Sequence, residues 1–198
     1  MGKEIERKFL VKSDDYKTPL TSKIYINQGY FAEGVRVRLS KSLGKDEGFI
    51  TFKSPTEGMT RTEFEYKIPF VEAEEILNNL CKGPIIEKTR HIIFYSGEKW
   101  EVDEFFGDNE GLVVAELEMS DEEHNFEKPD WLGEEVTQNK RYYNSDLTKN
   151  PFKNWGHLQQ ELEIVKNQKR IAVEEHNFEE AARLRDIEKS IEQKIELT

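Results

Sequence analysis

The sequence contains a single cysteine, Cys81, so the 198-residue chain cannot form an internal disulfide. It contains no apolar run close to the ~18 residues that a membrane-spanning helix needs. Its charged opening, Met1-Gly2-Lys3-Glu4-Ile5-Glu6, also lacks the apolar core of a signal peptide. These absences predict a cytoplasmic protein that does not bind membranes.

Positive charge is also in short supply. The chain has 40 acidic residues against 29 basic ones, which gives a formal net charge of -11 at pH 7. Proteins that bind nucleic acids generally present a basic surface to the phosphates, so we expect no direct nucleic-acid binding. Any phosphate site in this chain must therefore be local and shielded.

Several common catalytic signatures are missing as well. The sequence has no P-loop, no Gly-x-Ser-x-Gly elbow, no Cys-x-x-Cys pair and no His-Glu-x-x-His helix. The four histidines are dispersed, at positions 91, 124, 157 and 176, so none of them indicates a metal site. Carboxylates, lysines and arginines remain as the candidates for chemistry.

Alternating apolar and polar residues dominate the first 119 positions, and a period of two is typical of β-strands. One helix interrupts them at 71–82, where Ile76, Leu77 and Leu80 recur at helical spacing. Residues 120–155 are predicted to form loops with short helical pieces. The predicted strands lie near residues 3–11, 24–31, 34–41, 47–54, 60–68, 85–95, 98–105 and 111–119.

The composition changes after Gly156, because glycine and proline are absent from there to the end and good helix formers dominate. Asn177 followed by Glu180 is typical of a helix start, so we expect helices at about 158–175 and 178–196. The second helix carries an apolar stripe and therefore needs a partner surface. The stripe comprises Ala181, Leu184, Ile187, Ile191 and Ile195. Two domains are predicted, residues 1–155 and a helical hairpin at 157–198.

Charged residues recur on one face of the predicted strands. In the first strand Glu4, Glu6 and Lys8 share a face, and one such strand alone is most often the solvent-exposed side of a sheet. Recurrence in strand after strand instead favours a closed barrel with the charged faces inside and helices over the apolar outside. Because unpaired buried charges are costly, that interior must hold ions and water.

The two signs of charge in this interior suit different parts of a phosphate compound. Paired carboxylates supply the oxygen ligands that Mg²⁺ and Mn²⁺ prefer, and arginine and lysine bind phosphate oxygens. A metal beside a basic cluster predicts phosphoryl-transfer chemistry. The candidate metal ligands are Glu4, Glu6, Glu116 and Glu118, with Glu63, Glu65 and Asp103 next. The candidate phosphate-binding residues are Lys8, Arg36, Arg38, Lys53, Lys88 and Arg90.

In their order along the chain, these residues resemble the CYTH, or triphosphate tunnel metalloenzyme, family over about residues 1–155. The opening Glu4-Ile5-Glu6-Arg7-Lys8 is similar to the family's Glu-x-Glu-x-Lys strand. An isolated Glu-x-Glu pair is common, whereas the whole ordered series is specific. The other similar segments are Gln28-Gly29-Tyr30, Val35-Arg36-Val37-Arg38, Arg61-Thr62-Glu63-Phe64-Glu65, Lys88-Thr89-Arg90, Trp100-Glu101-Val102-Asp103, Ala115-Glu116-Leu117-Glu118, Pro129-Asp130-Trp131-Leu132-Gly133 and Lys140-Arg141-Tyr142-Tyr143-Asn144.

The resemblance implies an eight-stranded antiparallel β-barrel, or tunnel, that binds a linear triphosphate with a divalent cation. With the flanking helices and the C-terminal hairpin, the fold class is α+β. Compact bacterial members commonly resemble inorganic triphosphatases, which release pyrophosphate and phosphate, whereas thiamine triphosphatase and adenylate cyclase activities on the same tunnel remain open. The family also implies that Lys8 and Tyr30 cooperate in hydrolysis, although Tyr30 could equally be an ordinary strand tyrosine.

The tail resembles the UVR motif over residues 172–193, chiefly in the block Asn177-Phe178-Glu179-Glu180-Ala181-Ala182-Arg183-Leu184-Arg185-Asp186. That motif is a helical hairpin that mediates protein contacts in excision-repair nuclease subunits and chaperone-associated proteins. The resemblance implies a homodimer or a protein partner bound through residues 157–198. A triphosphate-sensing adaptor that acts through the hairpin is therefore a further hypothesis, and an amphipathic hairpin packed on its own barrel is the plain alternative.

Overall fold

A computed structural model describes residues 2–18, 21–55 and 58–196, with only the backbone described at residues 157, 158 and 193–196. The chain divides into two compact units, Met1–Phe152 and Lys153–Thr198, and each is treated separately below. No helix within the described ranges is both long and apolar enough to cross a bilayer. The division into functional domains at 1–155 and 157–198 stays a prediction.

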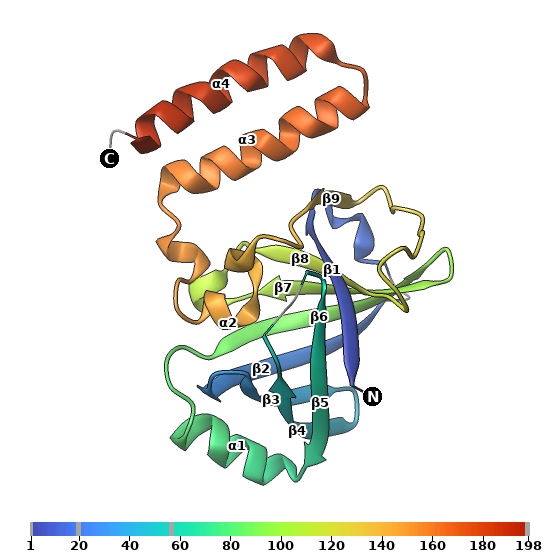
Figure 1. The fold of residues 1–198 in the computed structure, drawn as a ribbon, viewed down its shortest axis with the longest axis vertical. Helices are drawn as coiled ribbons and strands as arrows, with labels where there is room; N and C mark the ends of the chain where they lie inside the picture. The colour runs from blue at the N-terminus through green and yellow to red at the C-terminus, as the bar shows by residue number, and fades with distance from the viewer. Residues whose placement is uncertain (1, 19–20, 56–57, 197–198) are drawn as a thin grey trace. The chain divides into compact units, whose positions relative to one another are not determined.

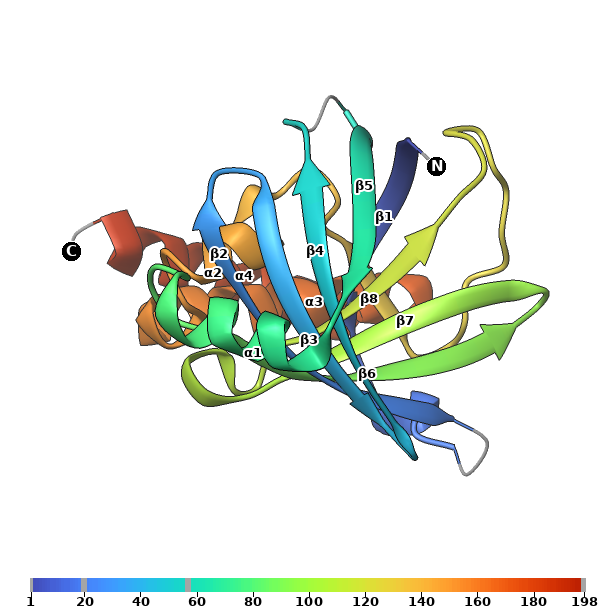
Figure 2. The ribbon, with the colours of Figure 1, turned by 90° about the horizontal axis from the view of Figure 1, so that it is seen from below.

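The first unit is a closed antiparallel β-barrel, seen from two directions in Figure 1 and Figure 2. Around the barrel the strands are β1 (Lys3–Val11), β5 (Thr60–Ile68), β4 (Lys45–Lys53), β3 (Val35–Ser42), β2 (Ser22–Ala32), β6 (Ile86–Tyr95), β7 (Glu98–Phe105) and β8 (Val113–Glu118). β8 pairs with β1 and so closes the barrel. The predicted fold class is confirmed, and every strand end lies within two residues of its predicted position.

A ninth strand, β9 (Leu132–Glu135), pairs with the end of β1 outside the barrel. The sequence pattern did not predict this strand, because it is four residues long and Gly133 interrupts its alternation. The rest of the 120–155 segment agrees with the expected loops and short helical pieces. These pieces are the helix α2 (Asn144–Leu147) and 3₁₀ turns at Lys140–Tyr142 and Phe152–Asn154. Two further 3₁₀ turns lie at Asp14–Tyr16 and Gly107–Asn109.

The apolar faces of the strands point outwards and are covered over part of the barrel, whereas Phe52, Phe64 and Tyr66 on β4 and β5 stay exposed. The helix α1 (Phe70–Asn79) lies against β3 and β4, where Ala73 and Leu77 pack with Val37 in one buried cluster. On the β1–β7–β8 side, Trp100 meets Trp131 edge to face with 5.6 Å between ring centroids. Because the outward faces are used for packing, the alternating charged faces are left for the barrel interior.

The second unit is a hairpin of two helices, α3 (His157–Glu174) and α4 (Phe178–Glu196), close to the predicted ranges (Figure 1). The Asn177 side chain accepts a hydrogen bond from the Glu180 N–H at 3.3 Å, so it caps α4 as expected. The apolar stripe of α4 packs against α3, so its partner surface is the other helix of the same hairpin. This buried cluster contains Val165, Ala172, Ala181, Leu184 and Ile191, with Leu162 and Ile187 against it; the Ile195 side chain lies outside the described residues.

Candidate active site

The barrel interior contains a cavity of about 1500 Å³. Acidic and basic side chains line it in nearly equal number, although the chain as a whole has a net charge of -11. Lys88 and Asp103 are the predicted site residues that do not line it, because they are buried beneath its surface. The predicted residues that line it are Glu4, Glu6, Lys8, Tyr30, Arg36, Arg38, Lys53, Glu63, Glu65, Arg90, Glu116 and Glu118.

The register of the strands brings these side chains together. Lys8 on β1 lies directly opposite Glu116 on β8, and Glu4 lies opposite Arg61 on β5. Directly opposite residues have Cβ atoms ~5 Å apart and point to the same side of the sheet. Charges of both signs are therefore in contact inside the barrel. Further inward pairs are Glu6–Glu118, Arg36–Thr51, Lys53–Glu63, Arg90–Asp103 and Glu101–Glu116.

The two signs are not spread evenly around the barrel. We define the acidic wall as the carboxylates of β7, β8 and β1 that line the cavity: Glu101, Glu116, Glu118, Glu4 and Glu6. We define the basic wall as the cations of the neighbouring strands β3 and β4: Arg36, Arg38 and Lys53. The cavity therefore offers oxygen donors on one side and cationic hydrogen-bond donors on another.

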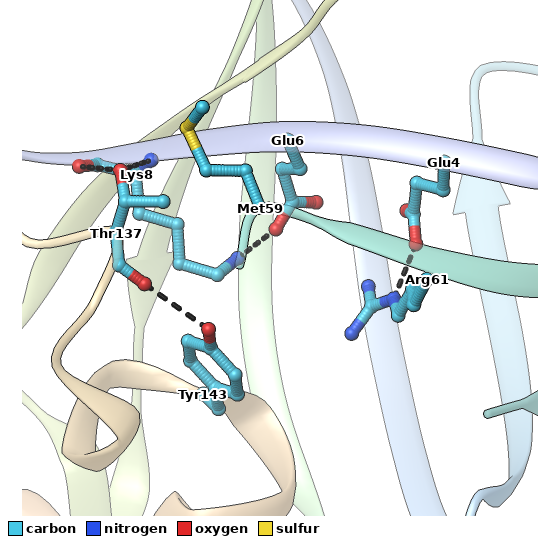
Figure 3. Close-up of a pocket in the computed structure, with 7 residues that line it drawn as sticks. All are labelled: Glu4, Glu6, Lys8, Met59, Arg61, Thr137 and Tyr143. Atoms are coloured by element: carbon cyan, nitrogen blue, oxygen red, sulfur yellow. Dashed lines mark hydrogen bonds and ion pairs between the residues drawn. The ribbon is translucent and has the colours of Figure 1, made fainter. Parts of the chain in front are cut away.

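Lys8 is buried within the acidic wall, with 5% of its surface exposed. Its Nζ forms an ion pair with Glu6 (Figure 3) and a second one, at 2.5 Å, with Glu116. Burial alone would lower the pKa of Lys8, but the Glu116 and Glu6 carboxylates outweigh it and raise that pKa above its ordinary range. Lys8 is therefore protonated at neutral pH and can donate hydrogen bonds, but it cannot act as a base.

Tyr30 lies on β2 directly opposite Arg36 and lines the same cavity. Its hydroxyl accepts a long hydrogen bond, 3.4 Å, from Gln28 Nε2. Burial raises the pKa of this hydroxyl, although the nearby Arg36, Arg61 and Lys8 cations act in the opposite direction. The tyrosine is therefore a neutral hydroxyl at neutral pH, and its joint role with Lys8 stays a prediction.

The basic wall has the properties of an anion site. Burial and the neighbouring Arg36 lower the pKa of Arg38 to about 10, and burial, Arg36 and Arg61 lower the pKa of Lys53 to about 8. The Nε atoms of Arg36 and Arg38 are also buried without a hydrogen-bond partner among the described residues. Crowded cations and unused donors are both costly, and a phosphate group at this wall would relieve both costs.

The acids next to the basic wall hold its side chains in place. Glu65 accepts from Arg36 at 3.0 Å and from Arg38 at 2.7 Å, and Glu63 forms an ion pair with Lys53. Both acids were predicted to help hold metal or water. In the structure both pair with cations of the basic wall, Glu63 also lies 3.8 Å from Arg61, and Glu65 also accepts a hydrogen bond from Thr51. A metal role for either acid would require a different set of contacts.

Lys88 and Asp103 form a fully buried ion pair, with 2.5 Å between Lys88 Nζ and Asp103 Oδ2. Asn144 Oδ1 accepts a second hydrogen bond from Lys88 Nζ at 3.3 Å, and Asp103 also accepts two hydrogen bonds from Arg90. Burial lowers the pKa of Lys88 to about 8 in spite of Asp103. The pair thus supports Arg90, which reaches the cavity, and does not itself line the cavity.

The acidic wall has the type of side chain that a divalent cation would require. Burial and the carboxylates of Glu4 and Glu101 raise the pKa of Glu118, and no ion pair of its side chain occurs within the described part of the chain. Uncompensated carboxylates are the hard oxygen donors that Mg²⁺ and Mn²⁺ prefer. Among the described residues, no three acidic, histidine or cysteine side chains lie close enough together to hold a metal ion in this arrangement. Glu6 and Glu116 instead contact Lys8.

Some lining residues were absent from the predicted set. Arg61 and Glu101 line the cavity at positions two residues from predicted ones, so the alternation alone was a sufficient signal for them. Tyr143 also lines the cavity and lies in the irregular segment after the barrel. No periodic signal marks a loop residue, and its approach to the cavity depends on long-range packing.

The chain is similar to known proteins of one domain family. A model of the CYTH domain matches residues 2–151. An inorganic triphosphatase from Acetivibrio thermocellus is 50% identical over 159 residues, 78% of this chain and 99% of that protein. An inorganic triphosphatase from Nitrosomonas europaea is 35% identical over 150 residues, 73% of this chain and 95% of that protein. A crystal structure of an inorganic triphosphatase matches with a TM-score of 0.53 and 32% identity, over 73% of this chain and 93% of that one.

Proposed function

The chain belongs to the CYTH domain family, and from this premise we propose that it hydrolyses inorganic triphosphate to pyrophosphate and phosphate. Both curated relatives bear the name inorganic triphosphatase. The observation that carries the proposal is the cavity inside the barrel with an acidic wall and a basic wall. In the reaction water attacks a terminal phosphorus, the anhydride P–O bond breaks, and pyrophosphate leaves.

The charge balance of the cavity supports a metal requirement. A triphosphate carries several negative charges, whereas the acidic and basic side chains of the cavity nearly cancel. The basic wall could bind the anion, but the carboxylates of the acidic wall would repel it. A divalent cation held by carboxylates of the acidic wall would reduce that repulsion. Enzymes of this family depend on metal in general, and we propose Mg²⁺ or Mn²⁺ for this chain.

The proposed metal-binding residues are those of the acidic wall. Glu4, Glu6, Glu116 and Glu118 would hold the ion, with Glu63, Glu65 and Asp103 as the further candidates. When bound, such an ion neutralises phosphate charge and activates a coordinated water. Glu118 needs the smallest change to bind it, because its described side chain forms no ion pair.

The proposed substrate-binding residues act through hydrogen bonds to phosphate oxygens. Arg36, Arg38 and Lys53 bind from the basic wall, and Arg90 binds from β6 with Lys88 behind it. Lys8 donates from the acidic side and stabilises the charge that develops on the transferring phosphoryl group. Tyr30, as a neutral hydroxyl, orients the water or donates to the departing oxygen.

A substrate panel tests the proposal. Phosphate release is measured from tripolyphosphate, thiamine triphosphate and ATP, each with Mg²⁺, with Mn²⁺ and with a chelator, and with the Glu6→Ala variant as control. We expect metal-dependent turnover with the highest kcat/KM on tripolyphosphate and none above background in the variant. Preference for an organic triphosphate would reassign the substrate, and no turnover in any arm would refute the proposal.

The adaptor hypothesis receives less support from the structure. It was motivated by an apolar stripe on the last helix, and the described part of that stripe is buried against α3. A homodimer or a protein partner at residues 157–198 stays a prediction. We propose that hydrolysis by the barrel does not require it.

A further inference from the structure

Lys8 contacts a segment that lies outside the barrel strands. The ring of Tyr143, at the start of α2, has its centroid 5.8 Å from Lys8 Nζ. The Tyr143 hydroxyl donates a hydrogen bond to the carbonyl oxygen of Thr137 at 3.0 Å (Figure 3). An aromatic face at this distance attracts an ammonium group. The contact is separate from the two carboxylates that pair with the same ammonium group.

The same segment also holds the backbone of Lys8. The Lys8 N–H donates to Thr137 Oγ1 at 3.0 Å, and the Val136 N–H donates to the Lys8 carbonyl at 2.8 Å. Thr137 is itself 4% exposed, so these hydrogen bonds are shielded from water. Thr137 therefore anchors the main chain of Lys8, and through its carbonyl it anchors the ring that lies on the Lys8 ammonium group.

We propose that Tyr143 is a positioning residue for hydrolysis, which keeps the Lys8 ammonium in one orientation towards the cavity. This inference rests on the proposed function. A lysine side chain has four rotatable bonds, and Glu6 and Glu116 attract its ammonium from two directions, so the carboxylates alone leave several conformers. The Tyr143 ring disfavours the conformers in which the ammonium group moves away from the ring face. The hydrogen bond from the Tyr143 hydroxyl to the Thr137 carbonyl holds the ring itself in place.

The alternative is that Tyr143 only packs the segment around α2. Kinetics separates the two roles, because Lys8 acts on the transferring group and a change in its orientation lowers kcat with little effect on KM. We expect Tyr143→Leu to lower kcat about tenfold and to change KM less than about twofold. Tyr143→Phe keeps the ring and removes the hydrogen bond to the Thr137 carbonyl, and its kcat should stay within about threefold of wild type. Tyr66→Leu is the matched control on the outer wall and should leave both constants unchanged.

A second measurement does not depend on turnover. The Tyr143 ring current should displace the Lys8 Hε resonances, which can be identified by their loss in Lys8→Arg. These resonances should move towards ordinary lysine values in Tyr143→Leu and keep their displacement in Tyr143→Phe. If wild type fails to hydrolyse tripolyphosphate but the resonances respond in this way, the proposed function fails and the positioning stands. Unmoved resonances, or wild-type kcat in Tyr143→Leu, would overturn the inference.

Discussion

The interior of the barrel and the interior of the helical hairpin bury opposite kinds of side chain. In the barrel, Lys8, Arg36 and Glu116 are each less than a tenth exposed and pair with opposite charges. In the hairpin, Leu184 and Ile191 are buried to the same degree and pack against apolar residues. Apolar contacts stabilise a fold outright, whereas buried ion pairs contribute little net stability. The barrel interior is thus costly and functional, and the hairpin interior is structural.

The largest expected effect comes from removing one carboxylate of the acidic wall. Glu6→Gln keeps the size of the side chain but removes a proposed metal ligand and one partner of Lys8. We expect kcat/KM for tripolyphosphate to fall about 1000-fold, more than the loss of an outer-shell group would cause. Steady-state phosphate release measures it. Glu47→Gln, the same change outside the cavity, is the control. Equal activity of both variants would show that a carboxylate of the acidic wall matters no more than one elsewhere in the barrel.

The hairpin provides the opposite case. Leu184→Ala leaves a gap in the cluster between α3 and α4 and should destabilise the hairpin by about 2–4 kcal/mol. Amide hydrogen exchange in residues 159–192 measures the change. Hydrolysis of tripolyphosphate should stay at the wild-type level, because no hairpin residue lines the cavity among those described. Loss of turnover in this variant would show that the two interiors are not independent.

The basic wall should respond less strongly than the acidic wall. Arg38→Ala removes one cationic donor while Arg36 and Lys53 remain, so we expect kcat/KM to fall about 10- to 100-fold with the fold intact. Circular dichroism shows whether Arg38→Ala is folded, and phosphate release from tripolyphosphate measures its kcat/KM. Lys41→Ala changes an exposed cation on the same strand and serves as control. Unchanged kinetics in Arg38→Ala would contradict the assignment of the basic wall to phosphate.

The smallest effect concerns an ion pair on the outside of the barrel. Burial of Glu135 acts to raise the pKa of its carboxyl group, but hydrogen bonds from Arg7 and Thr137 outweigh burial and lower that pKa below its ordinary value. A lowered carboxylate pKa stabilises the fold above the unfolded-state pKa, and this contribution is lost as pH falls through the folded-state pKa. Glu135→Gln should thus cost about 0.5–1 kcal/mol at pH 7 and nothing in strong acid. Urea unfolding of wild type and of Glu135→Gln at several pH values measures the difference in their free energies of unfolding. A difference that stays the same at every pH would refute this prediction.

The alternation of the strands predicted most of the barrel and its interior. It assigns each residue to one of two faces, which is why Glu4, Glu6 and Lys8 were placed inside correctly. Alternation carries no information on depth, so it could not show that Lys88 and Asp103 lie beneath the cavity surface. Depth depends on the packing of the segment after the barrel, where Asn144 reaches Lys88.

Arg7 shows that a signal can be present and still be missed. It is a charged residue on the outer face of β1, between the apolar Ile5 and Phe9. The structure pairs it with Glu135 on β9, at 2.8 Å between Arg7 Nε and Glu135 Oε1. A charge on an apolar face requires a partner from another element. The exception in the first strand therefore pointed to the ninth strand, which the local pattern did not predict.

The division of the cavity into an acidic and a basic wall is tested most directly by diffraction from crystals soaked with Mn²⁺ and a non-hydrolysable triphosphate. We predict an anomalous peak bounded by Glu6 and Glu118, with the distal phosphate oxygens on Arg36 and Arg38. A manganese peak outside the barrel, or a triphosphate bound with no metal between it and the acidic wall, would contradict the account.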